Sequence, residues 1–375
     1  MLAKLKVYKN YLKSSKVRNR IIVIESDDWG GIRMPSKSVF EILKGKEIDV
    51  ISNPFNSFDT LETDDDITVL LSLLNKIELK FKIKVKITLN FILANPDFDL
   101  IKASKYKQYY FKTFTETYSE SDKSQNVFSL IKEGISLGYF QPQFHAREHV
   151  DVDRWLSLLQ NKNLDVMEAF NNNTFGLSFK TNMGINLWQA YNYSTQKNMD
   201  LIKLSIIEGL SLFEDIFGFK SLSTIAPSGV WNNEIEEVWS NLGVKYIQSF
   251  VVQKESKPMR GQLKSVFHYT GQKSKNGLMY LVRNCFFEPS TNQNNDWVKI
   301  CFNQIRFAFF FNKPAVISMH RINFSGDIDK KRRDVSLNNF EILLSKIVAK
   351  WPDIKFMSSD ELGELISNKN IKLVK

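Results

Sequence analysis

Cysteine and histidine are scarce in this sequence, with two and four occurrences in 375 residues. Cys285 and Cys301 match no metal-binding spacing, and a chain of this length needs no disulfide to fold. With 16 glycines and 9 prolines, the sequence is also unlike a collagenous or disordered protein. The composition therefore predicts a globular protein with a large core.

Long hydrophobic runs are also absent. The first twenty residues are basic, and the apolar residues 21–24 that follow are too short for a signal peptide. The longest late apolar stretch, residues 307–319, is interrupted by Asn312, Lys313 and Pro314. We therefore expect no signal peptide and no transmembrane segment, and we interpret the protein as cytoplasmic.

Negative charge is in deficit, because 51 Lys and Arg stand against 41 Asp and Glu, a net charge of +10. The lysines are scattered, and no basic stripe coincides with a zinc finger or an aromatic RNA-binding pattern. We expect most of this charge to be solvated surface, and we expect no nucleic-acid partner.

Short β-branched segments alternate with segments of helical periodicity. Residues 21–25 predict a buried strand, and residues 64–76 predict a helix with Asp64 as its N-cap. Further strands are predicted at residues 85–93, 139–144, 221–226, 246–252, 279–286, 315–319 and 354–357. About seven or eight such βα units, without a Gly-rich phosphate turn, favour a parallel α/β barrel over a doubly wound sheet.

One stretch interrupts this alternation. Residues 171–198 are rich in Asn and aromatic residues. We interpret them as part of an insertion, around residues 150–220, on a single barrel domain that spans residues 1–375.

Two adjacent aspartates, Asp27 and Asp28, follow the first predicted strand. In a parallel barrel, functional groups collect at the carboxyl ends of the strands. Neighbouring carboxylates after a buried strand repel each other unless a cation or a proton lies between them. A helix cap or a turn would also explain aspartates at this position.

Two of the histidines, His145 and His149, are four residues apart. Imidazoles at i and i+4 of a helical turn share a face and can bind one metal. With Glu148 between them, the pair also has the HxxEH spelling of a class of zinc peptidases, in which the Glu is the base. That class needs a long helix, whereas this pair follows a strand-like segment that contains Pro142.

The other two histidines differ in their surroundings. His320 follows a late predicted strand, much as Pro227, Ser228 and Gly229 follow an earlier one, and each feature alone is generic. His268 has no metal-ligating neighbour, and we interpret it as structural.

In this order, the segments resemble the motifs of the polysaccharide deacetylase family (carbohydrate esterase family four). The family motifs run TFDDG, H[ST]xxH, RxPxG, DxxDW and LxH. The matching segments here are residues 25–29, 145–149, 225–229, 293–297 and 318–320. The aspartate pair, the histidine pair and the late histidine carry the resemblance.

The resemblance implies a deformed (β/α) barrel with about seven parallel strands, and a metal-dependent hydrolase that removes an acetyl group from an acetylated sugar or glycan. It implies that Asp28, His145 and His149 hold a divalent metal, usually zinc. It further implies that Asp27 is the general base and His320 the general acid.

The same resemblance implies that residues 227–229 line the substrate groove and offer a backbone N–H to an oxyanion. Aromatic residues near the motifs can stack on a sugar ring, with core packing as the alternative for each. They are Trp29, Trp231, Trp188 and Tyr191.

Two motif positions depart from the family. Ile225 stands where the family has the arginine that orients the base, and Gln293 stands where it has the acid that tunes the late histidine. The candidates to replace them are Arg283, Arg147 or Arg321 for the arginine, and Asp296 or Glu288 for the acid.

Two other functions stay open at this point. One is a zinc peptidase or amidase that uses Glu148 as its base. The other is a non-catalytic glycan-binding barrel. A loss of catalysis would explain the departures from the family motifs at residues 225 and 293.

Overall fold

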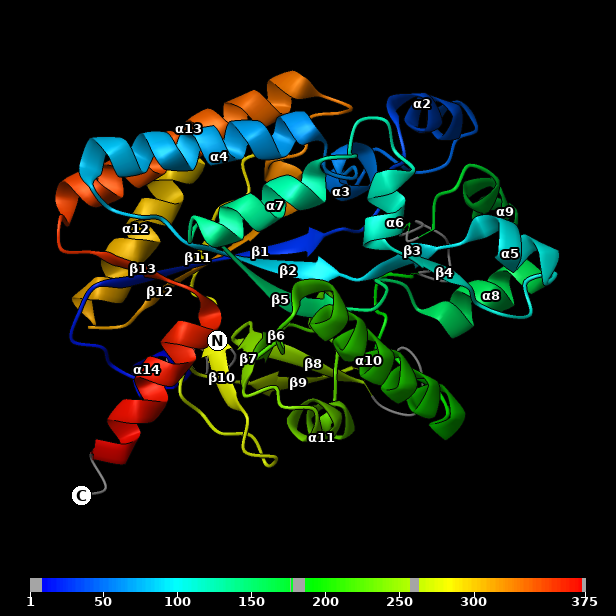
Figure 1. Cartoon of the computed structure of the whole chain (residues 1–375). Helices are drawn as coiled ribbons and strands as arrows, with labels where there is room; N and C mark the ends of the chain where they lie inside the picture. Colours follow the sequence, from blue (N-terminus) through cyan, green and yellow to red (C-terminus); the bar gives the residue numbers. More distant parts are fainter. Residues whose placement is uncertain (1–8, 176, 178–185, 257–262, 373–375) are drawn as a thin grey trace.

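The computed structural model describes residues 9–175, 177, 186–256 and 263–372 (Figure 1). The strands of its main sheet are β1 Ile21–Trp29, β2 Ile87–Ile92, β5 Phe140–Ala146, β6 Ser223–Thr224, β7 Tyr246–Ser249, β10 Met279–Val282, β11 Cys285–Phe286, β12 Ala315–His320 and β13 Lys355–Met357. They run in the order β10, β7, β6, β5, β2, β1, β12 and β11, with β13 on β1. Every neighbouring pair is parallel.

One chain segment joins the two edges of this sheet. β10 lies at one edge and β11 at the other, although only Arg283 and Asn284 separate them. The backbone N–H of Arg283 donates to the carbonyl of Ser249 in β7, and the backbone N–H of Asn284 donates to the carbonyl of Val316 in β12. With β10 and β11 counted as one bent strand, the eight strands of the path become a closed circuit of seven. The predicted deformed (β/α) barrel is confirmed.

Long helices pack around the barrel, which buries the apolar stripes seen in the sequence. They are α4 Asp64–Phe81, α7 Val127–Ser136, α10 Gln196–Phe217, α11 Asn233–Asn241, α12 Trp297–Phe310, α13 Lys330–Lys350 and α14 Ser359–Lys372. The N-cap of α4 is Thr63, which exchanges two hydrogen bonds with Asp66, so the predicted cap Asp64 was wrong by one residue. In the described part of the chain, no helix has the length and apolarity that crossing a bilayer requires.

Shorter elements form a lobe that Figure 1 shows to the right of the β1 and β2 arrowheads. It comprises α2 Lys37–Gly45, α3 Pro54–Phe58, β3 Ala94–Pro96, α5 Phe98–Ala103, β4 Phe111–Thr113, α6 Phe114–Ser119, α8 Val152–Gln160 and α9 Leu164–Asn171. A second apolar cluster, which includes Trp155 and Phe170, holds much of this lobe together. Within the expected insertion, α8 and α9 belong to the lobe, whereas α10 packs on β5 as a barrel helix. The assignment of the whole chain to one domain stays a prediction.

β1 extends four residues beyond its predicted end and is irregular there. Its pairing with β2 shifts register between Ser26 and Trp29, and Asp28 has a left-handed backbone with φ of 75°. Gly30 follows with φ of 81°, and a Cβ on it would lie 2.7 Å from the Ile92 carbonyl oxygen. The chain can therefore leave β1 in this direction only with glycine at position 30.

We expect Gly30→Ala to lower the free energy of unfolding by more than about 1–2 kcal/mol, because the left-handed backbone and the carbonyl contact both oppose a side chain. Gly45→Ala, on α2 with no atom within 4 Å of the added Cβ, is the matched control, and it should be neutral or stabilising. Urea unfolding measures both variants, and equal changes would contradict this role for Gly30.

Candidate active site and metal centre

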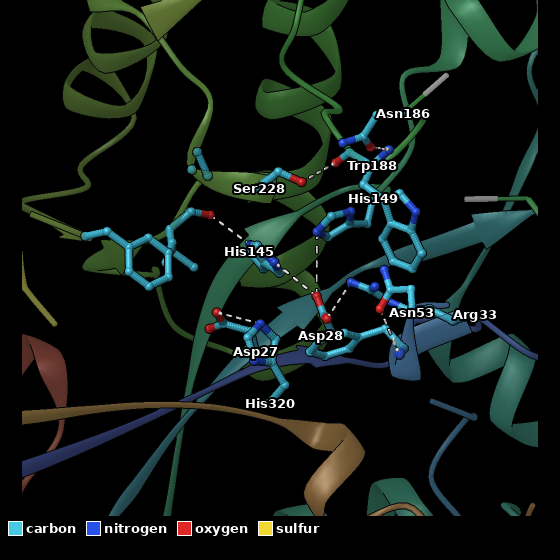
Figure 2. A pocket seen from close by; sticks show the side chains of 15 residues that line it. Asp27, Asp28, Arg33, Asn53, His145, His149, Asn186, Trp188, Ser228 and His320 are labelled. Carbon is cyan, nitrogen blue, oxygen red and sulfur yellow. Dashed lines mark hydrogen bonds and ion pairs between the residues drawn. The ribbon is translucent and has the colours of Figure 1, made fainter. Parts of the chain in front are cut away.

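A cavity of about 230 Å³ opens at the carboxyl ends of the barrel strands (Figure 2). Its lining includes Asp27 and Asp28 from β1, His145 from β5, His149 just after β5, and His320 from β12. The fold therefore brings together five candidate residues that span almost 300 positions of sequence.

Asp28, His145 and His149 form a compact buried cluster. Asp28 Oδ1 lies 3.3 Å from His145 Nε2 and 3.7 Å from His149 Nε2. The three residues are at most 5% exposed, and their ligand atoms lie within 4.8 Å of one another. Among the described residues, no other trio of His, Cys, Asp or Glu meets this spacing. Two imidazoles and a carboxylate are a donor set that suits a divalent transition metal.

The tautomer of His145 leaves an electron pair facing Asp28. His145 Nδ1 lies 2.8 Å from the Ile225 carbonyl oxygen, which can only accept, so Nδ1 carries the proton and Nε2 is unprotonated in the neutral ring. Burial lowers the pKa of His149 to about 3, although nearby Asp28 acts in the opposite direction. Asp28 Oδ1 is buried and has no hydrogen-bond partner in the described structure. Such a carboxylate oxygen is costly unless a cation lies beside it, so these residues fit a metal.

Arg33, which the sequence analysis did not identify, binds the other carboxylate oxygen of Asp28. Arg33 Nη2 donates to Asp28 Oδ2 at 2.6 Å, and Nε lies 3.1 Å from Asp59 Oδ2. Burial alone would raise the pKa of Asp28, but the Arg33 guanidinium brings it well below its usual range. Asp28 is therefore ionised and turned with its free oxygen toward the imidazoles. No motif marks Arg33 in the sequence.

Arg283 orients Asp27 through both carboxylate oxygens. Its Nη1 and Nη2 donate to Asp27 Oδ2 and Oδ1 at 2.6 and 2.7 Å, and its Nε donates to Glu25 at 2.6 Å. Burial favours the neutral acid, but Arg283 outweighs it and lowers the pKa of Asp27 to about 2. Of the three candidate arginines, Arg283 is therefore the one that binds Asp27.

The other two arginines have different partners. Arg321 binds Asp59 at 2.9 Å, and Arg147 binds its neighbour Glu148. Glu148 also accepts from the Ser205 hydroxyl of α10 at 2.8 Å, and it does not line the cavity.

The two histidines of the HxxEH segment do not share a helix. His145 lies near the end of β5, and His149 lies in the connection between β5 and α8. With Glu148 turned toward α10, the arrangement of the zinc peptidases is not present.

His320 is paired with Glu288, one of the two acids considered for this role. His320 Nδ1 lies 2.6 Å from Glu288 Oε1, and Nε2 lies 3.8 Å from Asp27 Oδ2. Burial lowers the pKa of His320, but Glu288 and the two aspartates outweigh burial and raise it to about 9. His320 is therefore protonated near neutral pH. Asp296 instead caps α12 by accepting the Lys299 N–H.

The 3-10 turn η1, Pro227–Gly229, is only partly at the cavity. Ser228 and Gly229 line it, whereas Pro227 is buried and does not. The Gly229 N–H already donates to the Ala226 carbonyl at 3.0 Å. The expectation that all three residues line the groove is therefore wrong for Pro227.

Trp29 and Trp231 are core residues, so their expected contact with substrate is wrong. Neither lines the cavity. Trp29 donates to Ser26 Oγ at 2.9 Å, and Trp231 donates to Glu236 Oε1 at 2.9 Å. His268 is also buried, and its ring stacks on Tyr280 at 3.8 Å between centroids.

Among the described residues of the insertion, Trp188 is the aromatic residue that reaches the cavity. The centroid of its ring lies 3.2 Å from the Arg33 guanidinium carbon and 5.5 Å from the centroid of the His149 ring. Tyr191 is buried and packs against Trp239. The lining also includes residues that the sequence analysis did not single out: Asn53, Phe55, Asn186, Ala226 and Phe250. Most belong to the lobe or to connections, where no local pattern marks a position.

Comparison with known proteins gives similar folds only. No family model matches the sequence, and no curated protein matches it. A putative polysaccharide deacetylase from Mycobacterium smegmatis is 9% identical, with a TM-score of 0.44 over 95% of this chain and 94% of that one. A probable polysaccharide deacetylase from Pseudomonas aeruginosa PAO1 is 9% identical, with a TM-score of 0.44 over 92% and 90%.

A 4-alpha-glucanotransferase from Thermococcus litoralis is also 9% identical, with a TM-score of 0.44 over 92% of this chain. The chain spans about 40% of the length of that protein.

In the metal-free protein, we expect Glu288→Gln to lower the pKa of His320 from about 9 toward its ordinary value, because the anionic partner is lost. The folded pKa lies above the unfolded value of about 6.5, so His320 stabilises the fold below that pH and this contribution disappears as pH rises through 9. In the variant, the stabilising contribution of His320 should disappear at a lower pH than in the wild type. NMR titration of the imidazole resonances measures the change.

Asp296→Asn is the control for this titration, since Asp296 is an acid nearby in sequence that caps α12 and does not contact His320. It should leave the titration of His320 unchanged. An unchanged pKa of His320 in Glu288→Gln would show that Glu288 does not raise the pKa of His320.

Proposed function

We propose that this protein is a metal-dependent hydrolase of the polysaccharide deacetylase type, which removes an acetyl group from an acetylated sugar or glycan. The observation that carries the proposal is the buried Asp28 Oδ1, which has no hydrogen bond to another described residue and faces His145 and His149. Three protein ligands of this kind, with a cavity beside them, are typical of a catalytic zinc site, so we propose Zn²⁺.

The chemistry that a divalent metal supplies in such a site is polarisation of a carbonyl and activation of water. Asp27 lies next in the chain to the proposed ligand Asp28 and is ionised, so it can accept a proton from the attacking water. His320 carries a proton near neutral pH and can donate it to the departing amine or hydroxyl. Each group would contribute about 10²–10⁴-fold to the rate.

The cavity also suits an acyl substrate. Pro227 has no N–H and the Gly229 N–H is used within the turn, so Ser228 is the residue of η1 that can offer one to an oxyanion. Phe55, Trp188 and Phe250 provide aromatic walls, and aromatic faces pack well against sugar rings.

The size of the cavity limits what can enter. Its volume of about 230 Å³ is below the ~300–1,000 Å³ usual for drug-sized ligands. We therefore propose that the acetyl group and part of one sugar unit enter it, while any remaining glycan lies outside.

Acetate release from acetylated oligosaccharides, with Zn²⁺ or Co²⁺ present, tests the proposal. We expect Asp27→Asn to lower activity by about 10²–10⁴-fold, because the base is lost. Glu148→Gln replaces a neighbouring acid that does not reach the cavity, and it should keep most of the activity.

The opposite ranking of these two variants would favour a peptidase or amidase that uses Glu148. Binding of the oligosaccharides by the wild-type protein, without acetate release under any metal condition, would support a non-catalytic glycan-binding barrel.

A further inference from the structure

The described parts of two basic segments without any acidic residue meet at the end of the barrel opposite the cavity. Residues 1–24 contain seven Lys and Arg, and residues 297–326 contain four, with no Asp or Glu in either. The first segment leads into β1, and the second contains α12 and leads into β12. Residues 9–20, before β1, and residues 311–314, before β12, therefore lie at the amino ends of strands whose carboxyl ends form the cavity.

Hydrogen bonds tie the two segments together. The Val17 N–H donates to the Asn312 carbonyl at 2.8 Å. Lys313 is buried, and its ammonium group donates to the carbonyls of Leu12 and Ser14. The described part of the N-terminal segment is thus fixed against the last turn of α12.

Large apolar side chains are exposed where the segments meet. Phe310 is 80% exposed, Phe307 48% and Leu12 46%. The Tyr11 ring lies 5.3 Å from that of Phe307, and the Phe311 ring lies 4.9 Å from Phe307 and 5.1 Å from Phe310. Single exposed apolar residues are ordinary, but Phe307 and Phe310 belong to one cluster of rings with Tyr11 and Phe311.

Basic side chains of the same two segments are also exposed. Lys9, Lys13, Lys16 and Arg306 are exposed, and none of them has an ion pair with another described residue. We call the exposed side chains of Leu12, Phe307 and Phe310, with these four basic residues, the α12 patch. Its charge is complementary to an anionic surface, and no carboxylate of its own two segments neutralises it.

We propose that the α12 patch binds the surface of an anionic lipid bilayer. Apolar side chains that enter the boundary of the headgroups, together with lysines that meet anionic lipids, are the combination by which proteins lie on membranes. A nucleic acid would pair with the lysines but would gain little from Leu12, so the apolar part of the patch favours the bilayer.

The position of the patch gives the bound protein an orientation. Figure 1 shows β1 and β2 pointing to the right, with α12 on the left. A protein bound through the α12 patch would open its cavity away from the bilayer, toward substrate in the aqueous phase. The proposal stands on surface residues alone and does not depend on the proposed enzymatic function.

Co-sedimentation of the full chain with lipid vesicles tests this binding. We expect binding to vesicles of phosphatidylcholine with phosphatidylglycerol, weaker binding at high salt, and little binding to phosphatidylcholine alone. Phe310→Ser and the double variant Lys9→Glu/Lys13→Glu should each lower the bound fraction at least about fivefold.

Leu164→Ser is the matched control, because Leu164 is 83% exposed on α9, outside the patch. It should bind vesicles as the wild type does, and circular dichroism should show all variants folded. The absence of vesicle binding in the wild type, or equal binding by Phe310→Ser, would overturn the proposal. Binding of an oligonucleotide in place of vesicles would also overturn it, and would identify the patch as a nucleic-acid surface.

Discussion

The site depends on how β1 ends. Successive side chains of a regular strand point to opposite faces, yet Asp27 and Asp28 both line the cavity. The register shift after Ser26 and the left-handed backbone of Asp28 make this possible. Such strain persists only where surrounding contacts hold it, and here the Arg33 ion pair provides one. The result is a carboxylate oxygen without a hydrogen bond, opposite two imidazoles.

Two arginines give the adjacent aspartates different roles. Arg33 takes one oxygen of Asp28 and leaves the other open, whereas Arg283 takes both oxygens of Asp27. Arg283 lies in the short junction that closes the barrel, so closure of the sheet and orientation of Asp27 have the same structural origin. Ile225, at the position of the missing motif arginine, instead supplies the carbonyl that fixes His145.

The alternation of apolar segments was sufficient to predict the barrel, because parallel strands with helical crossovers leave few other arrangements. The trio of Asp28, His145 and His149 was also predictable, since strand ends converge in such a fold. Phe55 was not, because it comes from a lobe whose position depends on its own apolar cluster, and Arg33 was not, because it lies in the connection between β1 and α2, where no motif marks it. Trp29 was assigned to the substrate from its place beside the motif, but a shift of one residue in a bulged strand decides whether a side chain enters the cavity or the core.

The metal content of purified protein tests the central claim most directly, with His145→Ala compared against His320→Ala. Both variants remove an imidazole from the same cavity, but only His145 belongs to the trio around Asp28 Oδ1. We predict about one Zn²⁺ per chain in the wild type and in His320→Ala, and at least about a tenfold loss of affinity in His145→Ala. Equal metal in all three proteins, or none in a wild type supplied with Zn²⁺, would contradict the account.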